Sequence, residues 1–92
     1  MYICTLHTDD PGYVPATAVA TGNTLDELVE GISDELAESF GPGPDKALSV
    51  SDENGNPIGD DIYSVCQAIH DGTACIVVRF PTHKNIFSII EI

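Results

Sequence analysis

Residues 24–41, TLDELVEGISDELAESFG, carry the strongest signal for a regular element in this 92-residue chain. Thr24 and Glu27 have the spacing of a capping box, in which a hydroxyl and a carboxylate accept hydrogen bonds from the free backbone N–H groups at a helix start. Apolar residues then recur at the helical period: Leu25, Leu28, Val29, Ile32, Leu36 and Phe40. Gly41 and the prolines that follow it end the pattern. We therefore expect one long amphipathic helix that packs on a core through this stripe.

The polar face of the same helix is acidic throughout. It contains six carboxylates and no base between residues 26 and 38: Asp26, Glu27, Glu30, Asp34, Glu35 and Glu38. Four of them form an unbroken row at i, i+4 spacing, in which each like-charge pair destabilises a helix by about 0.2–0.5 kcal/mol. A binding surface tolerates such an uncompensated cost, whereas an ordinary solvated face mixes the two signs of charge. We therefore predict that these six side chains contact a partner.

The rest of the chain alternates strand patterns with turn signals. We expect strands at residues 2–8, 13–22, 46–51, 73–80 and 85–92, and a short helix at 60–71. Pro15 favours an edge position for the second strand, because proline has no N–H for a neighbouring strand. The apolar run TACIVVRF favours a central position for the fourth strand. The pattern predicts one α+β domain over residues 1–92, in which a mixed sheet of four or five strands carries the long helix on one face.

The charge of the chain bounds the kind of partner it can have. Fifteen Asp and Glu oppose three Lys and Arg, which gives a formal net charge of −12. Such a field repels nucleic acid and anionic membranes and attracts basic surfaces. The alternative interpretation is adaptation to high salt, in which the acids only keep the chain in solution. The composition thus predicts a protein partner with a basic surface, with no direct contact to nucleic acid or membrane.

Location and redox state follow from what the sequence lacks. It has no run of about 18 apolar residues that could span a bilayer, and its first residues lack the basic and apolar regions of a secretory leader. We therefore expect a cytoplasmic chain. Its three cysteines, Cys4, Cys66 and Cys75, are expected to be reduced and mostly buried, although spacing alone leaves a disulfide open.

Signals for catalysis and for metal binding are weak. The sequence contains neither a G-x-S-x-G turn nor a glycine-rich phosphate loop, and His7, beside acids at a strand end, is most simply a surface residue. A zinc site could be drawn from Cys4, Cys66, His70 and Cys75, but the paired spacing of structural zinc ligands is absent. Cys66 also falls on an apolar stripe, where free cysteine acts as a small hydrophobe. We expect no catalytic residue, cofactor or metal, and a small hydrolase or metal-dependent enzyme is the third alternative.

Two parts of the sequence resemble known families. The opening hairpin, the helix LDELVEGISDEL and the run from ALSVSDENGNPIGDD to IYSVCQAIHDGTACIVVRF resemble ubiquitin-like β-grasp domains over roughly residues 1–80. This resemblance implies a sheet that grips one helix, and a role as a protein–protein adaptor. The segment DDPGYVPATAVATGNTLDELVEG is similar to the beginning of HicB-type antitoxins over residues 1–40. That family implies binding to a toxin, but the basic segment that would contact operator DNA is missing here.

These observations lead to one hypothesis and one main alternative. The first is a non-catalytic inhibitor that occupies the basic surface of a nucleic-acid-binding protein by imitating nucleic acid. Small acidic phage proteins that block host defence nucleases, CRISPR nucleases included, have this size and charge. The alternative is an antitoxin-like or ubiquitin-like adaptor that binds one protein through a sheet edge, at VPATAVA or NIFSIIEI. The same edges would allow a homodimer.

Overall fold

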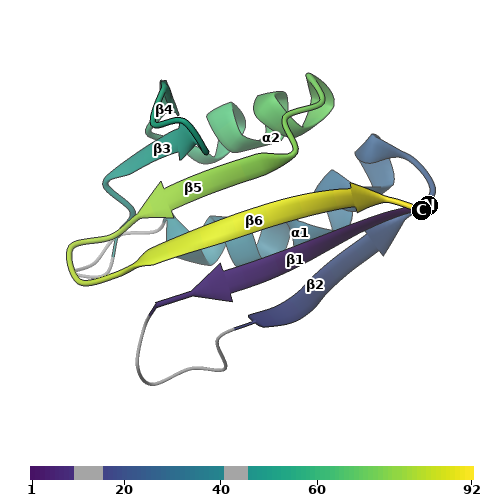
Figure 1. The fold of residues 1–92 in the computed structure, drawn as a ribbon, viewed down its shortest axis with the longest axis horizontal. Coiled ribbons are helices and arrows are strands. Elements are labelled where there is room, and N and C mark those ends of the chain that lie inside the picture. The colour runs from purple at the N-terminus through teal and green to yellow at the C-terminus, as the bar shows by residue number, and fades with distance from the viewer. Residues whose placement is uncertain (10–15, 41–45) are drawn as a thin grey trace.

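The chain folds into one sheet with two helices on one of its faces (Figure 1). The computed structural model describes residues 1–9, 16–40 and 46–92. Along the chain, its elements are β1 (Tyr2–Thr8), β2 (Ala16–Gly22), α1 (Leu25–Ser39), β3 (Ser49–Asp52), β4 (Pro57–Gly59), α2 (Ile62–His70), β5 (Cys75–Arg79) and β6 (Lys84–Glu91). The expected α+β class is confirmed, and so are the long helix and the short second helix.

The order of strands across the sheet is β2-β1-β6-β5-β3-β4. The last strand, β6, lies in the middle, where it is antiparallel to β1 on one side and to β5 on the other. β1 and β5 therefore run in the same direction without pairing with each other. The expectation of a mixed sheet is wrong, because every strand pair among the described residues is antiparallel. The strand expected from TACIVVRF is internal, as predicted, and β2 is an edge.

The sheet has six strands where four or five were expected, and β4 is the one that the sequence did not show. It is three residues long, which is too short for an alternating pattern. Before it, Asn54-Gly55, a pair typical of tight turns, forms a turn in which Asp52 Oδ1 accepts hydrogen bonds from the backbone N–H groups of Asn54 and Asn56, both at 2.9 Å. Gly55 has a φ of 84°, a conformation that glycine adopts without strain. Pro57 begins the strand at the sheet edge, where a missing N–H is tolerated.

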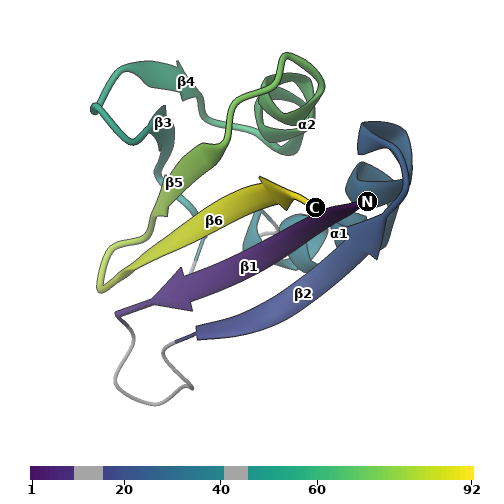
Figure 2. The ribbon, with the colours of Figure 1, turned by 45° about the vertical axis from the view of Figure 1, so that its right-hand side comes forward.

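The core lies between the sheet and the helices. Both helices lie behind the sheet in the view of Figure 1, and the turned view of Figure 2 shows the same two layers. α1 contacts β1, β2 and α2, and α2 also contacts β4. The largest side chains with under 2% exposure come from both layers: Leu28, Ile32, Leu36, Val65 and Ile69 from the helices, and Cys4, Val50, Ile76 and Val78 from the strands. The apolar stripe predicted for the long helix is thus its buried face.

Two glycines allow α1 to lie close to β2. A Cβ at Gly31 would be 3.3 Å from Cβ of Ala20, which confirms the close approach that a glycine in mid-helix indicates. A Cβ at Gly22 would lie 2.7 Å from the backbone nitrogen of Leu28, closer than such atoms can approach. β2 therefore runs directly into the first turn of α1, and this geometry fixes where the polar face of the helix points.

Candidate binding surface on the helix layer

The first turn of α1 is held by the capping box that the sequence predicts. Thr24 Oγ1 accepts a hydrogen bond of 3.2 Å from the backbone N–H of Glu27. In return, Glu27 Oε2 accepts one of 2.8 Å from the backbone N–H of Asn23. Both bonds satisfy donors that have no partner within the helix. Glu27, one of the six predicted partner-contacting residues, thus already has a structural role at the helix start.

The acid row begins at Asp26, and this residue has a partner from the other helix. Asp26 Oδ1 lies 3.1 Å from Nδ1 of His70, at the end of α2. The two side chains are 85% and 39% exposed, so an ion pair between them contributes about 1 kcal/mol at most. The expectation that the row lacks a compensating base holds within α1 only. The spacing of one helix could not show that His70 meets it from a second element.

Among the other predicted partner-contacting residues, the structure describes the side chain of Glu30 only. Glu30 is exposed, and its backbone carbonyl accepts a 2.9 Å hydrogen bond from Ser33 Oγ. The side chains of Asp34, Glu35 and Glu38 lie outside the described residues. The backbone of α1 is helical through Ser39.

Further carboxylates reach the same layer from α2, and sequence reasoning did not assign them to the surface. Asp61 caps this helix: its Oδ1 accepts hydrogen bonds from the hydroxyl and the backbone N–H of Ser64, at 2.7 and 2.8 Å. These bonds hold the pKa of Asp61 below its usual value. At the other end, Asp71 accepts a 3.0 Å hydrogen bond from the side chain of Gln67. Asp60, Asp61 and Asp71 flank α2 in the sequence. They can be assigned to the same surface as the acids of α1 only when both helices are known to lie on one face of the sheet.

We call the exposed carboxylates on and beside the two helices the acidic helix layer. Its described members are Asp26, Glu27, Glu30, Asp60, Asp61 and Asp71. No described residue of α1 or α2 is Lys or Arg. The layer is therefore negative across both helices, with His70 as the one group of these helices that can carry a positive charge.

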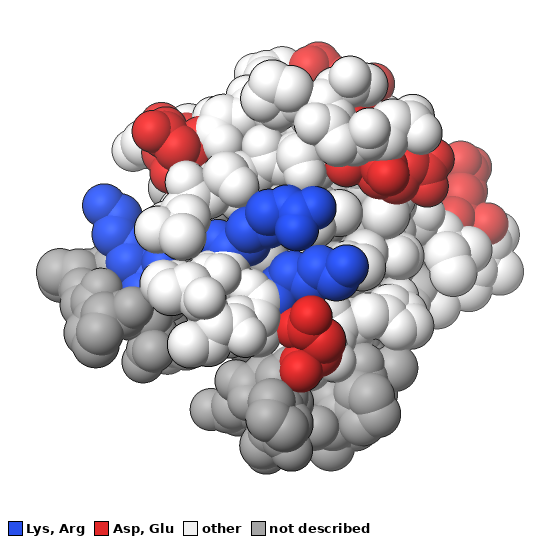
Figure 3. Space-filling view, turned by 60° about the vertical axis from the view of Figure 1, so that its left-hand side comes forward, with Lys and Arg blue, Asp and Glu red and all other residues white. Residues whose placement is uncertain are grey.

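The basic residues of the chain gather elsewhere. Figure 3 shows the Lys and Arg side chains close together on one face, with one acid beside them and other acids around the margin of the view. Arg79 and Lys84 stand opposite each other across β5 and β6, and Lys46 precedes β3 on the other side of β5. The backbone N–H of Lys84 donates a 2.7 Å hydrogen bond to Asp9 Oδ1. The rings of Phe80 and His83 stack with centroids 4.5 Å apart in the turn between these strands. The basic side chains are thus away from the two helices, and one carboxylate, that of Asp9, lies beside them.

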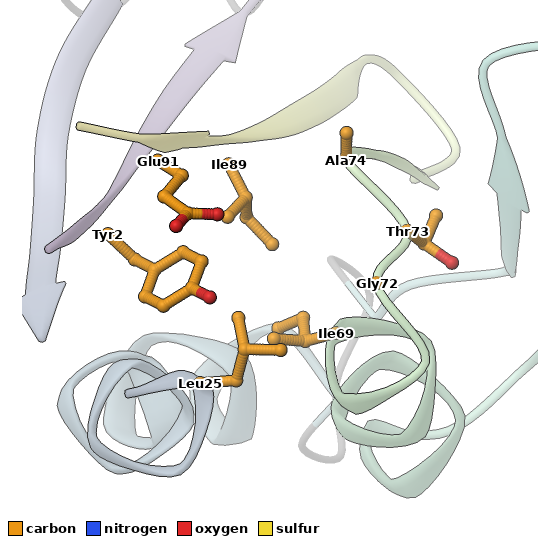
Figure 4. A pocket seen from close by; sticks show the side chains of 8 residues that line it. All are labelled: Tyr2, Leu25, Ile69, Gly72, Thr73, Ala74, Ile89 and Glu91. Carbon is orange, nitrogen blue, oxygen red and sulfur yellow. The ribbon is translucent and has the colours of Figure 1, made fainter. Parts of the chain in front are cut away.

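A small cavity opens between the helices and one end of the sheet. Its volume is about 260 Å³, and Figure 4 shows the residues that line it: Tyr2, Leu25, Ile69, Gly72, Thr73, Ala74, Ile89 and Glu91. The carboxylate of Glu91 lies beside the ring of Tyr2, across the cavity from Leu25 and Ile69. Apolar walls with one carboxylate match the aliphatic stem and charged head of a Lys or Arg side chain. Asp26 and His70 directly follow Leu25 and Ile69, so the cavity adjoins the acidic helix layer.

The cysteines are free thiols, and burial disfavours their thiolate forms. Burial raises the pKa of Cys4 to about 11, and it raises the pKa of Cys66 and of Cys75 as well. No group of three or more potential metal ligands occurs among the described residues, and the conceivable set of Cys4, Cys66, His70 and Cys75 is not brought together. Cys4 packs in the core, whereas Cys75 lies on the opposite face of the sheet.

Comparison with known proteins gave no relative: no family model matches the chain, and neither the curated proteins nor the solved structures contain a match. Within the described residues, neither helix has the length and apolar character needed to cross a bilayer.

Proposed function

We propose that this chain is a non-catalytic binding protein whose acidic helix layer occupies the basic surface of a nucleic-acid-binding protein. The observation that carries the proposal is that exposed carboxylates lie on and beside both helices, while neither helix contains a Lys or Arg. The two helices present their acids on one side of the sheet, and the Lys and Arg side chains lie together elsewhere (Figure 3). A partner can therefore meet the acids without meeting the bases of this chain.

The chemistry of nucleic-acid-binding proteins makes them the natural partners of such a layer. Their Lys and Arg side chains engage phosphates, and this charge contact supplies most of their sequence-independent affinity. A surface that offers carboxylates instead of phosphates competes for the same side chains. The cavity beside Asp26 gives one of these side chains a place to enter. Inhibition of a host defence nuclease by a phage protein is the biological setting that we favour for this mimicry.

The positions of the strands in the sheet limit which strand an adaptor could use to bind its partner. β6, which contains NIFSIIEI, is paired on both sides and cannot accept another strand. β2, which contains part of VPATAVA, is an edge and can do so. An antitoxin-like or ubiquitin-like adaptor would therefore bind through β2, and the carboxylates of α1 would matter little to it.

Capture from an extract of the native host at low salt tests the proposal. The variant carries Lys at four positions of the row: Asp26→Lys, Glu30→Lys, Asp34→Lys and Glu38→Lys. None of these positions is on the buried stripe, so circular dichroism should show a folded domain. We expect the wild-type chain to retain a nucleic-acid-binding protein, duplex DNA to displace it, and the quadruple variant to lose it.

Two matched single variants localise the effect. Glu30→Lys and Glu53→Lys change the net charge equally and both alter exposed residues, but Glu53 lies in the turn between β3 and β4, away from α1. Glu30→Lys should weaken capture more than Glu53→Lys does. Equal effects, or full binding by a folded quadruple variant, would show that the helix layer is not the binding surface.

A further inference from the structure

The floor of the cavity is formed by the ends of β1 and β6, which extend past the start of β5. The first residue of β5, Cys75, pairs with Ser88, whereas β6 continues to Glu91. Glu91 pairs with Tyr2 of β1, and paired residues share a face of the sheet. Tyr2 packs against the core, so both side chains point to the helix side. A carboxylate and an aromatic ring are thus placed next to each other on this floor (Figure 4).

The opposite wall comes from the two helices. Leu25 is the first residue of α1, and Ile69 lies in the last turn of α2 (Figure 4). Between this wall and the strands, the chain passes through Gly72, whose φ of 88° a larger residue would not adopt without strain. Glycine has no side chain to fill the space. The volume of about 260 Å³ is below the roughly 300–1,000 Å³ of pockets for small molecules, so the cavity suits a single side chain.

The polar groups of the cavity floor are free to bind a ligand. In the part of the chain that the structure describes, neither the carboxylate of Glu91 nor the hydroxyl of Tyr2 has a hydrogen-bond or ion-pair partner. The amino group of Met1 donates a 3.3 Å hydrogen bond to the backbone carbonyl of Ile92 and does not pair with Glu91. Glu91 therefore differs from Asp26, which contacts His70.

The surroundings of the cavity favour a positively charged ligand. The C-terminal end of α2, where backbone carbonyls give a partial negative charge, leads into the lining residues Gly72 and Thr73. The first turn of α1, where the partial charge is positive, contains Asp26 and Glu27. None of the residues that line the cavity is Lys, Arg or His. A cation that enters therefore meets one free carboxylate and no competing cation on the walls.

We propose that this cavity binds one arginine side chain, with its guanidinium group beside Glu91 and Tyr2 and its methylene stem against Leu25 and Ile69. The inference rests on the proposed function for the source of the arginine, which is the basic partner, and on the cavity for its chemistry. A planar guanidinium can stack on the tyrosine ring and donate two parallel hydrogen bonds to the carboxylate. The ammonium group of lysine is a more strongly hydrated point charge, which enters a cavity with apolar walls less readily.

The cavity and the acidic helix layer then have different roles in binding. Ion pairs at exposed carboxylates such as Glu30 each contribute little, and their attraction acts at a distance. An arginine that fills a pocket is the kind of contact that dominates the affinity of an interface. The layer attracts a basic surface, and the cavity selects a surface that presents an arginine at the matching position.

Backbone amide shifts of the ¹⁵N-labelled chain, titrated with N-acetyl-arginine amide, test the site without a partner. N-acetyl-lysine amide keeps the charge, and N-acetyl-norleucine amide keeps an unbranched stem without charge. All three are compared at one ionic strength. We expect the arginine probe to shift Tyr2, Gly72, Thr73 and Glu91 and to bind about fivefold more tightly than the lysine probe. The norleucine probe should cause no saturable shift.

Three variants identify the groups that bind the probe. Glu91→Gln keeps the size of an exposed side chain and should lower the affinity for the arginine probe about tenfold. Glu53→Gln makes the same change of charge in the turn between β3 and β4 and should have no effect. Tyr2→Phe keeps the ring and should retain most of the binding. An arginine probe that binds no better than lysine, shifts that spread along α1, or equal effects of Glu91→Gln and Glu53→Gln would overturn the inference.

Capture of the host partner separates this inference from the proposed function. Glu91→Gln should retain less partner than Glu53→Gln. Glu30→Lys should weaken capture and leave the affinity for the arginine probe unchanged, because Glu30 does not line the cavity. Capture that is equal for Glu91→Gln and Glu53→Gln would overturn the arginine site and leave the acidic helix layer as the binding surface. A chain that binds the probe in the cavity and captures no basic protein would contradict the proposed function, and the guanidinium site would stand.

Discussion

The face of the sheet that carries the helices and the face that carries none are built from alternate residues of the same strands. On β6, Phe87 is 2% exposed beneath the helices, while its neighbour Ile86 points the other way and is half-buried. The helix side of the inner strands is apolar, whereas the other face mixes Ile and Val with Thr, Ser, His, Arg and Lys.

The two faces also differ in the charged residues that they carry. The helix side carries the exposed carboxylates of both helices, together with Asp52 and Glu91 of the strands. On the face without helices, Arg79 and Lys84 pair across β5 and β6, and Asp9 accepts a hydrogen bond from the backbone N–H of Lys84. The difference teaches that the acids of the two helices lie on a side of the sheet that no Lys or Arg of the helices shares, so they can serve binding there.

Alanine substitutions of the neighbouring residues Phe87 and Ile86 on β6 should give the largest difference in stability. Phe87→Ala leaves a cavity in the core and should lower the free energy of unfolding by about 3–5 kcal/mol. Ile86→Ala, on the face without helices, should lower it by about 1 kcal/mol. Urea denaturation measures both. Equal losses would show that the two faces are buried alike, and the distinction between them would fail.

The stability of the domain should depend on pH through Asp61, whose carboxylate caps α2 on the helix side. Hydrogen bonds from Ser64 lower the pKa of Asp61 in the folded chain. Its stabilising effect is therefore complete above the ordinary Asp pKa of 3.8 and is lost as the pH falls through the lower, folded value. Denaturation of wild type and Asp61→Ala should show a difference at pH 7 that shrinks below about pH 4.

The cap of α1 provides the control for this experiment. Thr24 caps its helix with a hydroxyl that does not titrate in this range, so the effect of Thr24→Ala should vary less with pH than that of Asp61→Ala. If the difference between wild type and Asp61→Ala were constant down to pH 3, the hydrogen bonds to Asp61 would not be contributing through its charge.

Much of the fold could be predicted from local patterns. The capping box, the apolar stripe of α1 and the Asn54-Gly55 turn are short-range signals, and each is visible in the sequence at the residues that form it. The direction of strand pairing is a long-range property. Nothing in NIFSIIEI shows that it enters the middle of the sheet between β1 and β5, and that insertion turns an expected mixed sheet into an antiparallel one.

The candidate site could be predicted only as far as one helix allows. The acid row is visible in the sequence because its spacing is local. The contact of Asp26 with His70, and the acids added by α2, depend on two helices sharing one face of the sheet. Glu27 shows a different limit of sequence analysis. The residue fits both the acid pattern and the capping box, and in the structure its carboxylate accepts the capping hydrogen bond.

A salt series separates binding from adaptation to high salt. Screening of crowded carboxylates should raise the melting temperature modestly between 0.1 and 1 M NaCl, as the Debye length falls from about 10 to about 3 Å. We expect the domain to be folded already at the lower concentration. A chain that is unfolded at 0.1 M and folds only near 1 M would show that its acids serve salt adaptation.

The most direct measurement is the affinity for the captured basic partner across the same salt series, with wild type and Glu30→Lys side by side. We predict that wild type binds most tightly at 0.1 M and loses affinity steadily toward 1 M, chiefly through a slower association rate. Glu30→Lys should bind more weakly at 0.1 M and depend less on salt. An affinity that stays constant or rises with salt would contradict the central claim that the acidic helix layer binds a basic surface.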